Sequence, residues 1–393
     1  MHRPAKEEAS RERAVRLLAV LGDDPEGIAA LADHDGSTRP AHWPWRLRLP
    51  PGEEPQLEAW RRTVARSREV GAWRALVERF VQLRFPIREG ISSDPDYRVA
   101  VRRGEAPPPH ASPLCPSDPE GIEIRLHSSV AGWVPVILAR HRADFELLVR
   151  ALALRNEPRP VPPAQGACLV TGLVDWERVA RHRERWERGR GRAAGGWAEE
   201  MRCLRARPEL YLDRLVIATV GPYSGVPAPE GLDARSWERL SLRIRLGHEC
   251  THYLAARAFG RLRHDILEEL LADWVGLLCA TGSYDRELAR RFLGLGDDGA
   301  VTAGGRLHLY RGDPPLTGAA FALLGELASR GVEALAAMEN ELGTAAVDRT
   351  VQARVVLAAS TLPEWELAVP GFAGRVLGLV KQLEGRMWAS EAR

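Results

Sequence analysis

The sequence has almost no lysine. Only Lys6 and Lys381 are lysines among its 55 basic residues, so the other 53 are arginines spread along the 393-residue chain. The 53 acidic residues leave a formal net charge of +2. Proteins that bind nucleic acid by charge carry a marked excess of basic residues, so we expect no nucleic-acid partner.

Long apolar segments and paired cysteines are lacking as well. The longest apolar windows, Ala131–Ala139 and Leu270–Ala280, fall short of the roughly 18 residues that a membrane span needs. The N-terminus is charged and has no apolar core of a secretory signal. The five cysteines are odd in number, widely spaced and without a CxxC pair, which is typical of free thiols in a reducing compartment. We therefore expect a cytoplasmic protein with no membrane contact.

Hydrophobic periodicity divides the chain into three parts. Residues 1–104 have apolar residues at helical spacings and predict an N-terminal helical region. Residues 105–120 are rich in proline and predict a linker or an exposed loop. Residues 121–393 form the remaining domain, whose pattern is entirely helical from about residue 283. Strands are expected at Ile122–His127, Ala167–Thr171 and Arg214–Val220.

The motif that points to chemistry is His248-Glu249-Cys250-Thr251-His252, an HExxH sequence within a long predicted helix, 234–259. Two histidines four residues apart lie on one helix face, where both imidazoles can bind one metal ion. Glu249 lies about 100° around the helix and is placed to reach a water on that metal.

A second predicted helix supplies carboxylates. It begins after Gly260 and a short loop, and Asp265 with Glu268 has the form of a capping box, which assigns Glu268 a structural role. Glu269 and Asp273 are four residues apart on one face of this helix. A catalytic zinc needs three protein ligands and one open position, so Glu269 is the candidate third ligand. Asp273 is placed to hydrogen-bond to a ligating histidine.

An HExxH helix followed by ExxxD on the next helix resembles the gluzincin zinc metallopeptidases. The form Glu-Glu-x-x-Ala-Asp-x-x-Gly, from Glu268 to Gly276, is similar to their compact, minimal members. The resemblance covers about Arg245–Gly282. It implies an α+β fold, mostly helical, with a small zincin-like sheet and an active-site helix that carries HExxH. It also implies Zn²⁺ as cofactor, a peptide or protein substrate, and a substrate-binding edge strand, for which Arg214–Val220 is the candidate.

By this resemblance, His248, His252 and Glu269 are zinc ligands, Glu249 is the general base and Asp273 orients His248. Such enzymes also use a tyrosine or histidine that stabilises the oxyanion of the transition state. The sequence leaves several candidates for that donor. They are Tyr223, His264, His308 and Tyr310, with His308 and Tyr310 placed first because a downstream donor is common in the families that the chain resembles.

Two other functions remain open at this point. The gluzincin-like core could be a non-catalytic binding or regulatory module that retains its metal site, although the presence of Glu249 favours an enzyme. The chain could also be a helical interaction protein with a chance HExxH. In that third case His248 and Glu269 would lie far apart in the fold.

Overall fold

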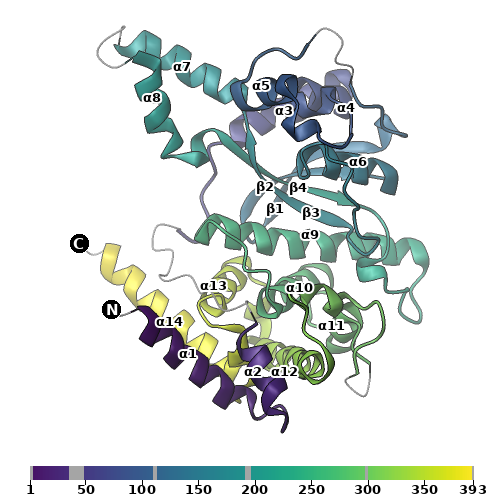
Figure 1. Ribbon diagram of the computed structural model, residues 1–393, viewed down its shortest axis with the longest axis vertical. Coiled ribbons are helices and arrows are strands. Elements are labelled where there is room, and N and C mark those ends of the chain that lie inside the picture. The colour runs from purple at the N-terminus through teal and green to yellow at the C-terminus, as the bar shows by residue number, and fades with distance from the viewer. Residues whose placement is uncertain (1–2, 35–47, 109–112, 191–195, 297–299, 392–393) are drawn as a thin grey trace. The chain divides into compact units, whose positions relative to one another are not determined.

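Figure 1 shows the computed structural model, which describes residues 3–34, 48–108, 113–190, 196–296 and 300–391. The chain forms two compact units, one from Gly52–Gly221 and one from Met1–Pro51 together with Pro222–Arg393. Helices dominate, and the described strands form one four-stranded mixed sheet. The predicted α+β fold is confirmed.

The boundaries of these units differ from the division expected at residues 104 and 120. Trp60 and Leu76 from the N-terminal helices pack in one hydrophobic core with Ile124 and Ile137 from the sheet. The described residues 105–108 and 113–118 of the proline-rich stretch lie outside helices and strands, and the Leu114 N–H donates to the carbonyl of Leu83 at 2.7 Å. Burial of apolar helix faces against the sheet therefore joins residues that the sequence pattern separates.

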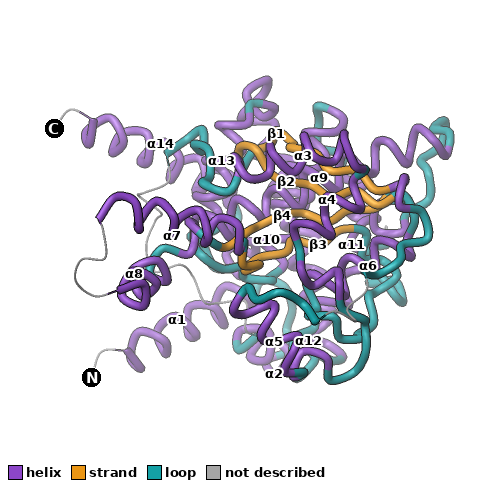
Figure 2. Tube along the Cα trace, turned by 90° about the horizontal axis from the view of Figure 1, so that it is seen from above, coloured by secondary structure: helices purple, strands orange, loops and turns teal. Residues whose placement is uncertain are grey.

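The sheet has the strand order β1-β2-β4-β3, as Figure 2 shows from above. Its strands are β1 (Ile122–Ser129), β2 (Gly132–Ala139), β3 (Ala167–Val174) and β4 (Leu212–Thr219). β4 is parallel to β2 and antiparallel to β3. The expectation that Arg214–Val220 is an edge strand is therefore wrong, because β4 pairs with a strand on each side and cannot add an extended substrate.

Six α-helices among the described residues belong to the sheet unit. They are α3 (Leu57–Val70), α4 (Ala72–Arg79), α5 (Pro95–Arg103), α6 (Arg142–Leu152), α7 (Trp176–Arg190) and α8 (Gly196–Arg205). Gly71 separates α3 from α4 with a φ of +87°, in the region that favours glycine. The helices α3, α4 and α6 cover the face of the sheet that carries Ile124 and Ile137.

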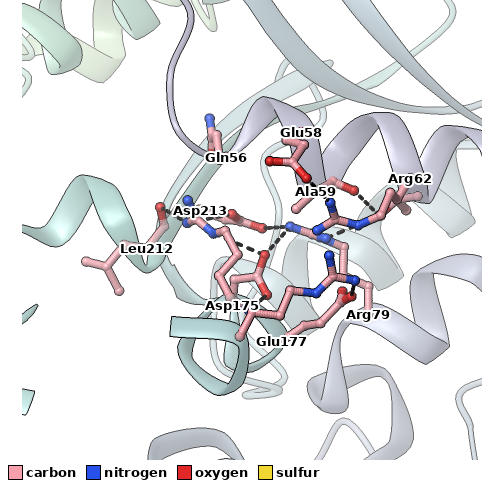
Figure 3. A network of polar contacts seen from close by, with 12 residues as sticks. Gln56, Glu58, Ala59, Arg62, Arg79, Asp175, Glu177, Leu212 and Asp213 are labelled. Carbon is pink, nitrogen blue, oxygen red and sulfur yellow. Dashed lines mark hydrogen bonds and ion pairs between the residues drawn. The ribbon is translucent and has the colours of Figure 1, made fainter. Parts of the chain in front are cut away.

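A buried ionic network lies in this unit (Figure 3). The Arg79 guanidinium donates to Asp175 at 2.7 Å and to Asp213 at 2.6 Å. Arg178 donates to the second oxygen of Asp213 at 3.1 Å. Two arginines and two aspartates give no net charge, so the network ties α4 and α7 to β4 without leaving a buried charge unpaired.

The second unit is a group of helices. They are α1 (Arg3–Leu18), α2 (Pro25–Ala32), α9 (Ala234–Phe259), α10 (Ile266–Thr281), α11 (Arg286–Leu293), α12 (Gly318–Leu342), α13 (Arg349–Ala359) and α14 (Phe372–Glu391). Asp233 caps the start of α9 by accepting from the Ser236 N–H, and Gly260 ends it in the left-handed conformation. Within the described residues, none of the helices combines the length and the apolar character needed to cross a membrane.

Candidate metal centre

The site is built on α9 and α10, which meet through the short turn at residues 260–265. The turn uses left-handed backbone at Gly260 and at His264, whose φ is +58°. The two helices approach closely at Gly247 and Gly276, where a Cβ added to Gly247 would lie 2.8 Å from the Gly276 Cα. Only glycine fits this crossing, which brings the HExxH face of α9 against the acidic face of α10.

Three potential ligand groups converge at this crossing. Nε2 of His248 and Nε2 of His252 lie 3.0 Å apart. The Glu269 carboxylate lies 3.2 Å from the His252 nitrogen and 3.5 Å from that of His248. Donor atoms around a tetrahedral zinc with bonds of about 2.05 Å are separated by about 3.3 Å. The spacing, burial and donor types of this cluster therefore fit a divalent metal of the zinc class.

The opposite ring nitrogens fix how the two imidazoles are protonated. Nδ1 of His248 lies 2.8 Å from Asp273, and Nδ1 of His252 lies 3.3 Å from Glu268. An ionised carboxylate only accepts hydrogen bonds, so each Nδ1 carries the proton. Each neutral imidazole then directs its Nε2 lone pair at the other and at Glu269, an arrangement that needs a proton or a metal cation between them.

The charges around the cluster also attract a cation. Burial lowers the pKa of His252, but the carboxylates of Glu269 and Glu268 outweigh burial and raise this pKa well above its usual range. Burial raises the pKa of Glu269, and attraction to His252 and His248 outweighs it and holds this pKa well below its usual range. Glu269 is therefore an anion at neutral pH, as a metal ligand must be.

Three polar residues, Asp273, Tyr223 and Arg306, form a hydrogen-bonded group on the Nδ1 side of His248. Asp273 accepts from the Tyr223 hydroxyl at 2.6 Å and pairs with the Arg306 guanidinium. Arg306 also donates to the Tyr223 oxygen at 2.9 Å. Burial raises the pKa of Asp273, but Arg306 and His248 outweigh burial, so this pKa is lowered and Asp273 stays ionised. Burial, together with Asp273, raises the pKa of Tyr223 well above its usual range, which keeps the hydroxyl a donor.

Two further residues of the predicted site are Glu249 and Tyr310. Glu249 is partly exposed and, among the described residues, forms no hydrogen bond or ion pair. Tyr310 lies near the Glu269 carboxylate, and burial followed by the Glu269 charge raises its pKa well above the usual range. Tyr310 therefore presents a protonated hydroxyl next to the third ligand.

The remaining predicted donors do not join the cluster. His308 bonds to the Thr302 carbonyl at 3.2 Å and packs on Phe321, and the side chain of His264 is exposed. Tyr223 reaches the site, but at the Nδ1 edge of His248, opposite the Nε2 ligand atom. The expectation that Tyr223 or His308 stabilises an oxyanion is therefore wrong in this structure, and of the four candidates Tyr310 is the one that lies near Glu269.

The sequence did not predict the role of Arg306 or the contact between the Glu268 side chain and His252. Asp265 does cap α10 by accepting from the Glu268 N–H at 2.8 Å. The Glu268 side chain, however, accepts from the N–H groups of Arg263 and His264 and faces His252. The i, i+16 pairing of Glu268 with His252 follows from the short turn and could have been inferred from it. Nothing marks Arg306 among the 53 arginines, because its partners lie 33 and 83 residues away in sequence.

Comparison with known proteins leaves the function open. No curated protein matches the chain, and no solved structure matches it. The model of one protein family, described as a family of unknown function, matches residues 17–370, which is most of the sequence. The chain belongs to this family, DUF7005.

Proposed function

We propose that the protein is a zinc-dependent metallohydrolase, most simply a peptidase. The observation that carries the proposal is the convergence of two Nε2 lone pairs and the Glu269 carboxylate, while both Nδ1 atoms are held by Asp273 and Glu268. A proton can bridge only one pair of these groups, whereas a metal cation can bind all three at once.

The chain supplies the parts that hydrolysis requires. His248, His252 and Glu269 would hold zinc, which when bound lowers the pKa of water and polarises a carbonyl group. Glu249 accepts a proton from the attacking water and passes it to the leaving amine. Tyr310 would donate to the developing oxyanion, a role that its raised pKa and the nearby Glu269 carboxylate support. The substrate class rests on the resemblance of HExxH…ExxxD to gluzincin peptidases, which points to a peptide or protein amide.

Metal analysis tests the site. We expect about one zinc per chain in purified protein, lost on His248→Ala or Glu269→Ala and retained on Glu249→Gln. His308→Ala is the matched control, because this histidine lies outside the cluster and its loss should leave the zinc content unchanged. Protein that stays free of zinc under metal-replete conditions would contradict the proposal.

Hydrolysis tests the chemistry. Wild-type protein is incubated with a mixed peptide library, and new termini are identified by mass spectrometry. Glu249→Gln should retain zinc and lose cleavage by a factor of at least about 10². Wild-type protein that binds zinc and cleaves nothing in the library would instead favour the non-catalytic module that retains a metal site.

A further inference from the structure

The sheet unit carries a groove that the metal site does not use. It has a volume of about 820 Å³ and lies between α3 and the edge strand β1. Figure 2 shows α3 over the β1 side of the sheet. The strand contributes Ile122–Leu126 to the groove. Because β1 ends the strand order, no second strand of the described chain pairs with its outer side.

The shape of the groove favours a bound peptide with an extended backbone. An edge strand presents unpaired N–H and C=O groups on its outer side, and an added strand satisfies them. The helix beside the strand leaves space for side chains, since Val64 and Ala65 of α3 and Ala72 of α4 form an apolar wall. Peptides that join a sheet in this way place alternate side chains toward such a wall.

The excess of basic side chains in the groove favours an acidic partner. Arg61, Arg68 and Arg125 line it, against a single acidic residue, Glu123. Arg61 pairs with Glu53, and Arg125 lies 3.7 Å from Glu123. Arg68 is exposed and has no ion-pair partner among the described residues. Its guanidinium is therefore available to a carboxylate of a bound peptide.

A large apolar anchor lies at the same place. Trp133 lines the groove with 44% of its surface exposed, although tryptophan is a residue that proteins usually cover. Tryptophan and arginine are enriched among the residues that contribute most of the binding energy at protein interfaces. The groove thus combines an edge at Ile122–Leu126 that no described strand covers, the exposed Arg68 guanidinium and an aromatic surface.

We propose that the α3–β1 groove is a docking site for an acidic, extended peptide segment of a partner protein, which adds to β1 as a fifth strand. This site is independent of the metal chemistry, and the test below requires neither zinc nor hydrolysis. Edge pairing supplies the affinity for a strand, while Arg68 and Trp133 supply the preference for acidic and apolar side chains.

The test measures fluorescence anisotropy of a labelled peptide of alternating Glu and Val, using the full-length Glu249→Gln protein so that no probe is cleaved. We expect saturable binding that weakens as salt rises. A Lys and Val peptide of the same alternation should not bind, because it repels the arginines. An acidic peptide with proline at alternate positions should not bind either, because it lacks the N–H donors that strand pairing requires.

Two exposed positions locate the binding. Arg68→Glu and Trp133→Ala should each weaken binding about fivefold or more, while Arg188→Glu, an exposed arginine on α7, should leave it unchanged. Hydrogen exchange should slow at Ile122–Leu126 when the acidic peptide is bound.

Three results would overturn the proposal. They are the absence of saturable binding at millimolar peptide, equal binding of the proline or basic peptides, and unchanged affinity in both groove variants. Sedimentation distinguishes another occupant. A concentration-dependent dimer that Arg68→Glu disrupts would assign the groove to a second copy of the chain and refute a separate partner.

Discussion

Nδ1 of His248 lies 2.8 Å from Oδ1 of Asp273, one helical turn beyond Glu269 on α10. The contact joins the HExxH helix to the ExxxD helix at a point behind the ligand atoms. It fixes the proton of His248 on Nδ1 and leaves Nε2 as the lone pair that faces Glu269. The orientation of one proposed ligand is therefore set by a residue that would not touch the metal.

Replacing this carboxylate should weaken metal binding without removing a ligand. In Asp273→Asn the neutral amide is a weaker acceptor for the His248 Nδ1–H, and we expect zinc affinity to fall about 10- to 100-fold. The measurement is competition against a chromophoric zinc chelator. Asp285→Asn, which alters the cap of α11, is the control and should bind zinc as wild type does. Equal affinities of Asp273→Asn and wild type would show that Asp273 does not orient the ligand.

Arg306 should matter for stability because its partner is buried. The side chain of Asp273 is 1% exposed and that of Arg306 is 10% exposed. Arg306→Met leaves the carboxylate buried without its cation, which should lower the free energy of unfolding by about 3 kcal/mol. Arg286→Met is the matched control, since Arg286 and Glu333 are both more than half exposed and should contribute less than about 1 kcal/mol. Urea unfolding of the zinc-free proteins compares them. Similar losses in both variants would contradict this role for Arg306.

The crossing of α9 and α10 should not tolerate a methyl group. A Cβ added at Gly276 would lie 2.7 Å from the Ile244 carbonyl oxygen, so Gly276→Ala must push the helices apart. We expect the free energy of unfolding to fall by about 1–3 kcal/mol and zinc binding to weaken, because Glu269 moves with α10. Gly374→Ala in α14, where nothing lies within 4 Å of the added Cβ, should be neutral or stabilising. Thermal unfolding and zinc titration of both variants test this, and intact zinc affinity in Gly276→Ala would refute it.

The buried network of Figure 3 predicts a pH effect on stability. Burial raises the pKa of Asp213 to about 6, above about 3.9 in an unfolded chain. Between pH 4 and 6 the Asp213 carboxyl is protonated in the folded protein but ionised in the unfolded chain. Its contribution to the free energy of unfolding therefore has its full value below about pH 4. It is lost as the pH rises through 6, by up to about 3 kcal/mol.

Asp213→Asn removes this titration. The free energy of unfolding of wild type minus that of Asp213→Asn should therefore decrease as the pH rises from about 4 to 7. Urea unfolding of both proteins across this range measures the difference, in which the titrations common to both proteins cancel. A difference that is constant or increases with pH would contradict the raised pKa of Asp213.

The local parts of the site could be predicted from the sequence because helix geometry is periodic. His248 with His252, and Glu269 with Asp273, are each four residues apart, so each pair shares one helix face once a helix forms. The cap at Asp265 and the helix end at Gly260 could be predicted for the same reason, since helix termini use local hydrogen bonds.

The order of the strands could not be predicted in this way. Ala131–Ala139 is an apolar window for which no strand is predicted, yet β2 occupies Gly132–Ala139 and pairs with β4. That pairing makes β4 central and leaves β1 as an edge strand. Strand neighbours are set by contacts between distant segments, which one strand's apolar pattern does not encode.

The sequence by itself determined that two adjacent helices present two imidazoles and a carboxylate, because those positions depend on helical spacing and one short turn. Only the tertiary structure decided which groups complete the site. It brought Arg306 and Tyr223 behind His248 and placed Tyr310, but not His308, beside Glu269. These partners are separated by tens of residues, and their contacts form only when the helices pack and bury their charges together.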